Sequence, residues 1–168
     1  MSIPTDIKAL TELFRELGAQ SPESWASSQV NEGFNQLHRF LFLRQAWSRV
    51  ISENDDTWIE DNIATATTHP DQPFAGIGHA LGRMLSAGVA REDIVDLARG
   101  MQGQLLFDIC YLLGDPSLPD SSVDEVGWTL VETDEDYAPT LNAIEGLHES
   151  VLDTDPTGRE MRPRTAAA

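Results

Sequence analysis

The longest regular pattern in this sequence is an apolar stripe that follows the segment Arg91-Glu92-Asp93. Its residues recur at steps of three and four, the spacing of one face of an α-helix, over about five turns. The stripe consists of Ile94, Leu97, Ala98, Met101, Leu105, Ile109 and Leu112. Acidic residues suit the first turn of a helix, because the free N–H groups there carry a partial positive charge. The pattern therefore predicts a long helix that ends at Gly114 and packs its apolar side into a core.

A second segment, residues 34–51, is apolar around much of its circumference, as is typical of a helix near the centre of a bundle. Shorter helical patterns, marked by polar caps, proline starts or glycine stops, occur at five other places. They lie at residues 7–17, from Ser21-Pro22 onward, and at residues 58–63, 74–87 and 146–153. The sequence thus predicts an all-α fold, a single compact bundle of six to eight helices over residues 1–158, with a flexible tail at 159–168.

Residues 121–145 have two interpretations. Val123, Val126 and Leu130 follow helical spacing, which favours a helix. Gly127 weakens that interpretation, because glycine is unfavourable inside a helix, and residues 128–131 have the composition of a strand. A short β-hairpin near the C-terminus is therefore the alternative.

The charge of the chain is strongly negative and unevenly distributed. There are 28 Asp and Glu residues against 11 Lys and Arg residues, which gives a formal net charge of −17. The interval between Arg99 and Arg159 contains no Lys or Arg. Because like charges repel, this composition argues against nucleic acid or an anionic membrane as a direct partner. It favours a basic protein partner, since acidic surfaces speed the encounter with cationic ones.

Four residues are the candidate contacts for such a partner. Trp58 has acidic neighbours and is the tryptophan expected to be exposed, and tryptophan is enriched at binding hot spots. Asp134, Glu135 and Asp136 form an acidic run in a predicted loop. A surface that only keeps the protein in solution is the alternative explanation for such a run.

The motifs for cofactors and metals are incomplete. Gly76, Gly78 and Gly82 are spaced one residue too far apart for a dinucleotide fingerprint, and no predicted strand precedes them. We expect these glycines to let another helix approach closely. A calcium-loop frame that starts at Asp134 has Pro139 where that loop requires glycine. We therefore predict no cofactor and no metal site.

Asp108 falls inside the apolar stripe of the long predicted helix. A buried carboxylate is costly unless it is paired or hydrogen-bonded, so we expect Asp108 and Arg44 to form a buried polar pair. In the alternative interpretation, this pair lines an interhelical pocket with His79 or His38, in a small-molecule-binding protein or a small enzyme.

The sequence contains no recognisable catalytic motif, so we expect a non-enzymatic acidic protein-binding module that binds a basic protein partner. Inhibitors such as the immunity proteins that neutralise nuclease toxins share its size and charge, a comparison of physical properties and not of sequence. A homodimer through the two long apolar helices is a further assembly that the sequence allows. The lone Cys110 is expected in the core, and the first residues lack the pattern of a secretory signal, which predicts a cytoplasmic location.

Overall fold

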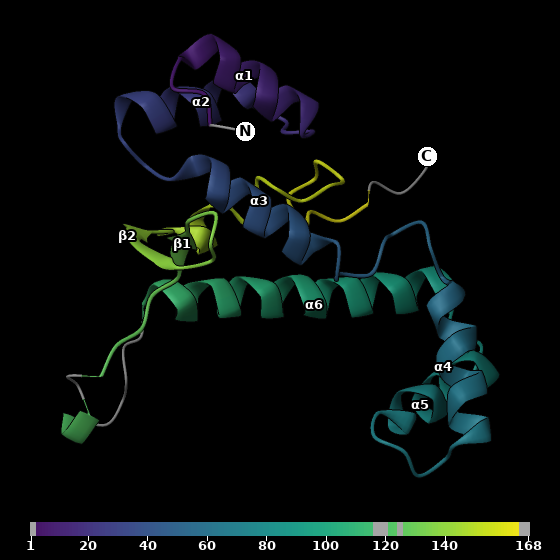
Figure 1. Ribbon diagram of the computed structural model, residues 1–168. Coiled ribbons are helices and arrows are strands. Elements are labelled where there is room, and N and C mark those ends of the chain that lie inside the picture. Colours follow the sequence, from purple (N-terminus) through teal and green to yellow (C-terminus); the bar gives the residue numbers. More distant parts are fainter. Residues whose placement is uncertain (1–2, 116–120, 124–125, 165–168) are drawn as a thin grey trace. The chain divides into compact units, whose positions relative to one another are not determined.

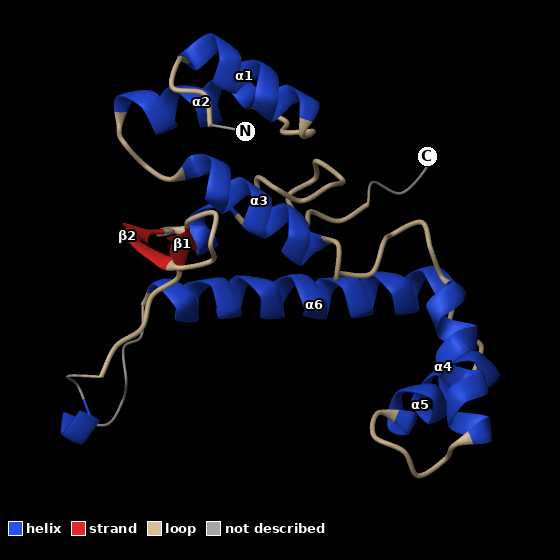
Figure 2. Ribbon diagram, in the orientation of Figure 1, coloured by secondary structure: helices blue, strands red, loops and turns tan. Residues whose placement is uncertain are grey.

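The computed structural model describes residues 3–115, 121–123 and 126–164 (Figure 1). Within these residues the secondary structure consists of six α-helices, one antiparallel two-stranded hairpin and two short 3-10 helices, as Figure 2 shows. The elements are α1 (Ile7–Glu16), α2 (Pro22–Asn31), α3 (Gln36–Trp47), α4 (Thr57–Thr68), α5 (Ala75–Ser86), α6 (Arg91–Gly114), η1 (Ser121–Val123), β1 (Val131–Thr133), β2 (Pro139–Ala143) and η2 (Leu147–Ser150). The predicted helical fold with a short hairpin near the C-terminus is confirmed.

The helices and the hairpin are distributed over two compact units, each with its own cluster of buried apolar side chains. The first unit consists of Met1–Arg49 together with Gln104–Ala168, and the second consists of Val50–Gly103. A single domain over residues 1–158 stays a prediction.

Three aromatic rings from three helices form the centre of the first unit. They are Phe14 of α1, Trp25 of α2 and Phe40 of α3. The ring centroids are 5.9 Å apart for Phe14 and Trp25, 5.6 Å for Phe14 and Phe40, and 5.4 Å for Trp25 and Phe40. Leu10 and Leu37 belong to the same buried cluster. Offset and edge-to-face arrangements of this kind are the favoured geometries for aromatic pairs. The helical spacing of the apolar residues therefore brings one face of each helix into a shared core.

The C-terminal segment of the chain packs onto α3. Trp47 is buried, and its indole Nε1 donates a hydrogen bond to the main-chain oxygen of Val151 at 2.9 Å. Leu147 and Val151 are buried as well. The last part of the chain therefore contributes to the core of the first unit.

Asp155 organises the turn that follows. Its carboxylate is 1% exposed and accepts hydrogen bonds from the main-chain N–H groups of Thr157, at 3.1 Å, and Met161, at 3.0 Å. The Thr157 hydroxyl donates to the same carboxylate at 2.7 Å. The predicted tail at 159–168 thus begins within a turn attached to Asp155, and residues 165–168 lie outside the described residues.

The apolar stripe of α6 is exposed along most of its length. Ile94 is buried, but the large side chains that follow it in the stripe are exposed, and Met101 is the most exposed at 67%. These exposed side chains are Leu97, Met101, Leu105, Ile109 and Leu112. The expectation that the whole stripe lies in a core is wrong. Helical spacing shows that these side chains share one face of α6, but it does not show whether another element packs against that face. No described helix is long and apolar enough to cross a membrane.

Cys110 lies away from the exposed stripe and is fully buried, as predicted. Burial raises the pKa of its thiol to about 11, above the ordinary value of 9.0, because the thiolate loses its hydration. We expect a thiol reagent at pH 8 to modify the folded protein about a hundredfold more slowly than the unfolded protein, as measured by absorbance with and without denaturant. From pH 9 to 11 the unfolded thiol ionises first, so the free energy of unfolding falls. Equal modification rates in both states would contradict the burial of Cys110.

In the second unit, α4, α5 and the start of α6 share a core that contains Ile59, Leu81 and Ile94. Gly78 of α5 lies directly against α4. A Cβ atom at this position would stand 2.1 Å from the main-chain oxygen of Asn62, whereas one at Gly82 would meet nothing within 4 Å. The expectation that the glycines permit close helix approach is therefore confirmed at Gly78.

β1 and β2 pair antiparallel, with Val131 opposite Ala143 and Thr133 opposite Pro139. The favoured helix over this region is wrong for the residues from 126 onward, and residues 124 and 125 lie outside the described residues. The turn between the strands provides the physical reason. Asp134 Oδ1 accepts hydrogen bonds from the N–H groups of Asp136 and Ala138, both at 2.9 Å, which closes the hairpin locally.

Candidate functional site

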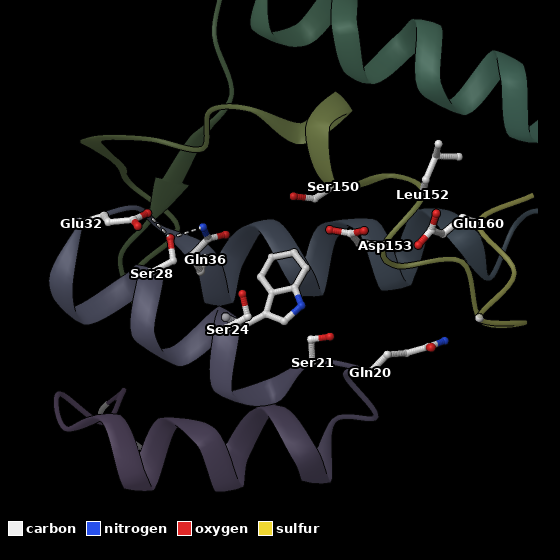
Figure 3. Close-up of a pocket in the computed structure, with 12 residues that line it drawn as sticks. Gln20, Ser21, Ser24, Ser28, Glu32, Gln36, Ser150, Leu152, Asp153 and Glu160 are labelled. Atoms are coloured by element: carbon white, nitrogen blue, oxygen red, sulfur yellow. Dashed lines mark hydrogen bonds between the residues drawn. The ribbon is translucent and has the colours of Figure 1, made fainter.

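A polar cavity of about 390 Å³ lies between α2, the start of α3 and the C-terminal segment of the first unit, and we call it the α2 cavity (Figure 3). Ser21, Ser24 and Ser28 lie on one face of α2, because they are three and four residues apart in a helix. Ser150 and Asp153 contribute the opposite wall from the C-terminal segment. Residues more than a hundred positions apart in the sequence therefore face the same space.

A chain of hydrogen bonds at one end of the α2 cavity leaves an acceptor unpaired. The Ser28 hydroxyl donates to Glu32 Oε2 at 2.6 Å, and Gln36 Nε2 donates to Ser28 Oγ at 2.8 Å. A serine hydroxyl has a single proton, so Ser28 must accept from Gln36, and this fixes the orientation of the Gln36 amide. Gln36 Oε1 is buried and has no hydrogen-bond partner among the described residues, in a side chain that is 7% exposed.

The α2 cavity carries negative charge. Glu32, Asp153 and Glu160 line it, and no Lys or Arg is among its described lining residues. The Asp153 carboxylate is exposed and forms no hydrogen bond or ion pair within the described part of the chain. Glu160, in contrast, accepts a hydrogen bond from Arg162 at 2.5 Å. The site is therefore rich in acceptors and has one free carboxylate.

Arg39 lies behind the Ser150 wall and is itself buried. Its Nη1 donates to Ser150 Oγ at 3.3 Å, which leaves the Ser150 hydroxyl proton available to a further acceptor. Burial lowers the pKa of Arg39, because the guanidinium loses hydration, and the charges of Glu149 and Glu145 oppose that effect. The Arg39 guanidinium therefore helps to hold the Ser150 side chain in the wall of the α2 cavity.

A second cavity, of about 600 Å³, lies between the start of α3 and the hairpin. Glu132 lines this cavity and accepts hydrogen bonds from Asn35 at 3.0 Å, Thr140 at 3.2 Å and Asn142. These bonds, that of Asn142 first, hold the pKa of Glu132 below its ordinary value, although desolvation opposes them. His38 Nδ1 is 3.6 Å from the carboxylate. A carboxylate that accepts three hydrogen bonds and has a lowered pKa is a poor proton acceptor at neutral pH, which argues for a structural role.

The predicted buried pair of Asp108 and Arg44 does not form. Both side chains are exposed, and Asp108 Oδ1 accepts a hydrogen bond from Gln104 on its own helix at 3.0 Å. The expectation is wrong because the stripe that contains Asp108 faces solvent, so its carboxylate keeps its hydration. Neither residue lines either of the two cavities described above.

The candidate contact residues lie in different environments. Trp58 is half-buried and packs against the core of the second unit, so the expectation of an exposed tryptophan is wrong. Asp134, Glu135 and Asp136 are exposed in the hairpin turn, as a solvated acidic run should be. Tyr137 follows them and is 86% exposed.

Several residues of these sites escaped the sequence interpretation. Tyr137 and the fully exposed Leu141 flank the acidic turn. The signal for Tyr137 was an aromatic residue directly after three acids. No sequence pattern singles out Gln36, because its position in the α2 cavity depends on its bond to Ser28 and on the C-terminal segment that forms the opposite wall.

The chain matches no protein-family model, and no curated protein or solved structure shows significant similarity to it. Among the described residues, no group of three or more His, Cys, Asp or Glu side chains has the arrangement to hold a metal ion.

Proposed function

We propose that this protein is a non-enzymatic binding module for a basic protein partner, of the inhibitor or immunity type. The observation that carries the proposal is the hairpin turn, where three exposed carboxylates adjoin the exposed aromatic ring of Tyr137. Exposed aromatic side chains supply contact area at low entropic cost and are frequent binding hot spots. The carboxylates of Asp134, Glu135 and Asp136 would attract a cationic surface to that ring.

The turn is suited to binding because its backbone is held in one conformation. Asp134 Oδ1 accepts two main-chain hydrogen bonds, and the Tyr137 N–H donates to the main-chain oxygen of Asp134 at 3.1 Å. Tyr137 has a φ of 62°, a left-handed conformation that non-glycine residues adopt only when their surroundings enforce it. A preorganised loop loses less conformational entropy on binding than a disordered one.

A homodimer remains part of the proposal as a second assembly. The exposed apolar side chains of α6, from Leu97 to Leu112, are a surface that a second copy of the chain would bury favourably. The cytoplasmic location predicted from the sequence also belongs to the proposal.

Affinity capture from the source cell tests the proposal. The immobilised wild-type protein should retain a basic protein at about 50 mM NaCl and release it at about 500 mM, because salt screens exposed charges. Tyr137→Ala should reduce retention of that protein about tenfold or more, as for an interface hot spot. Glu135→Lys should reduce retention of that protein by more than Tyr137→Ala does, because it reverses a charge in the turn.

The matched control is Glu16→Lys, which makes the same charge change at an exposed position of α1. It should leave retention nearly unchanged. Equal loss with Glu16→Lys and Glu135→Lys, or retention that is insensitive to Tyr137→Ala, would contradict the hairpin as the binding surface. Light scattering of the free protein reports separately on the homodimer.

A further inference from the structure

We propose that the α2 cavity binds a primary ammonium group, supplied either by a free polyamine or by a lysine side chain. The lysine source rests on the proposed function, because the lysine would belong to the basic partner. The polyamine source does not. The inference stands on three features of the cavity: its unpaired acceptor, its charge and its dimensions.

The unpaired acceptor is Gln36 Oε1. It is buried at the end of the cavity, and its amide orientation is fixed by the bond from Nε2 to Ser28. In Figure 3 the Gln36 oxygen points away from Ser28 and Glu32, toward the side where Ser150 lies. Buried polar atoms without a partner are rare in native proteins, and one in a residue that lines a cavity indicates a missing donor. An ammonium group offers three donors and no acceptor, which fits such a site.

The charge of the cavity selects a cation. Glu32 and Asp153 line it, the Asp153 carboxylate has no partner in the described chain, and no described lining residue is Lys or Arg. Trp25 also contributes to the lining, and aromatic rings attract cations. The described carboxylates do not gather as a metal site would require, so an organic cation fits better than a bare metal ion.

The dimensions and the rim suit an aliphatic amine. A volume of about 390 Å³ lies within the range of small-ligand sites. Leu152, on the C-terminal wall, is exposed and lines the cavity, so it offers apolar surface to the methylene groups of an amine chain. The serine hydroxyls of α2 would accept hydrogen bonds from the ammonium protons. These features together favour a chain with an ammonium end over a compact neutral molecule.

Calorimetric titration of the full chain tests the inference with four probes. Spermidine represents the free polyamine, and Nα-acetyl-lysine methylamide represents the lysine side chain. The Nε-acetylated form of the second probe removes the charge, and glucose represents a neutral polyhydroxyl ligand. Both ammonium probes should bind at one site per chain, and the two neutral probes should bind about ten- to a hundredfold more weakly or not at all.

Two variants locate the binding in the cavity. Gln36→Met removes the unpaired acceptor at similar volume. Asp153→Asn removes the free carboxylate at an exposed position, where we expect little effect on folding. Each should weaken ammonium binding about tenfold or more. Glu16→Gln, outside the cavity, makes the same charge change as Asp153→Asn and should bind like the wild type. Asp153→Asn keeps the test valid if Gln36→Met does not fold.

The outcomes separate the possible sources. Spermidine binding without lysine-probe binding assigns the site to a free polyamine, and binding of both supports a partner lysine. No ammonium binding at about 10 mM probe, glucose binding, or equal affinity for the acetylated probe would overturn the inference. Tyr137→Ala should not change spermidine affinity, so failure of the hairpin proposal and failure of the cavity proposal are distinguishable.

Discussion

Replacing Gly78 with alanine should lower the free energy of unfolding by about 3 kcal/mol, the upper end of the usual cost of overpacking. The new Cβ would stand 2.1 Å from the main-chain oxygen of Asn62 and 2.6 Å from Ala66 Cβ. A main-chain oxygen cannot rotate away as a flexible side chain does, so α4 and α5 must separate. Alanine has the higher helix propensity by about 1 kcal/mol, which offsets only part of this cost. Urea unfolding followed by circular dichroism measures the change.

Gly82→Ala is the matched control for this experiment. Gly82 lies in the same helix, and a Cβ there meets nothing within 4 Å. We expect this variant to be stabilised by about 0.5–1 kcal/mol, since alanine has the higher helix propensity and no steric clash opposes it here. Similar destabilisation by both substitutions would show that the close contact of α4 with Gly78 does not exist in solution.

Asp155→Ala should destabilise the protein by about 3 kcal/mol, because it removes a buried acceptor from three part-buried donors at once. The carboxylate accepts hydrogen bonds from the main-chain groups of Thr157 and Met161 and from the Thr157 hydroxyl. Because the Asp155 side chain is only 1% exposed, water does not readily replace it, and these donors would lose their hydrogen bonds without compensation. The midpoint of chemical denaturation, compared with that of the wild type, measures the loss.

Asp153→Ala provides the control two residues away. Asp153 is exposed, so its removal should change the free energy of unfolding by no more than about 0.5 kcal/mol. A near-neutral Asp155→Ala would mean that the turn around Asp155 is hydrated and that the C-terminal wall of the α2 cavity is not rigid.

The sequence predicted those elements whose signals are local. α1 ends where Gly18 adopts a φ of +87°, and its N-cap, Asp6, accepts a hydrogen bond from the Ala9 N–H at 2.9 Å. Such features depend on a few neighbouring residues, which is why a single sequence is sufficient for them.

Features that depend on distant residues were not predictable in the same way. Periodicity placed Asp108 on an apolar face but could not show that the face is exposed. The sequence offers the hairpin only as an alternative, because its turn depends on main-chain hydrogen bonds that the Asp134 side chain accepts. The α2 cavity was missed, since the serines of α2 form one wall only, and Ser150 and Asp153 complete it from the far end of the chain.

The bond from Trp47 to Val151 joins positions 104 residues apart, which has a consequence for synthesis on the ribosome. At typical elongation rates of about 5–20 residues per second, α3 waits roughly 5–20 seconds for the segment that covers Trp47. During that interval an indole and its neighbours stay open to solvent or to chaperones. The long loop between Trp47 and Val151 also slows folding, because the chain loses the entropy of closing it before the stabilising contacts form.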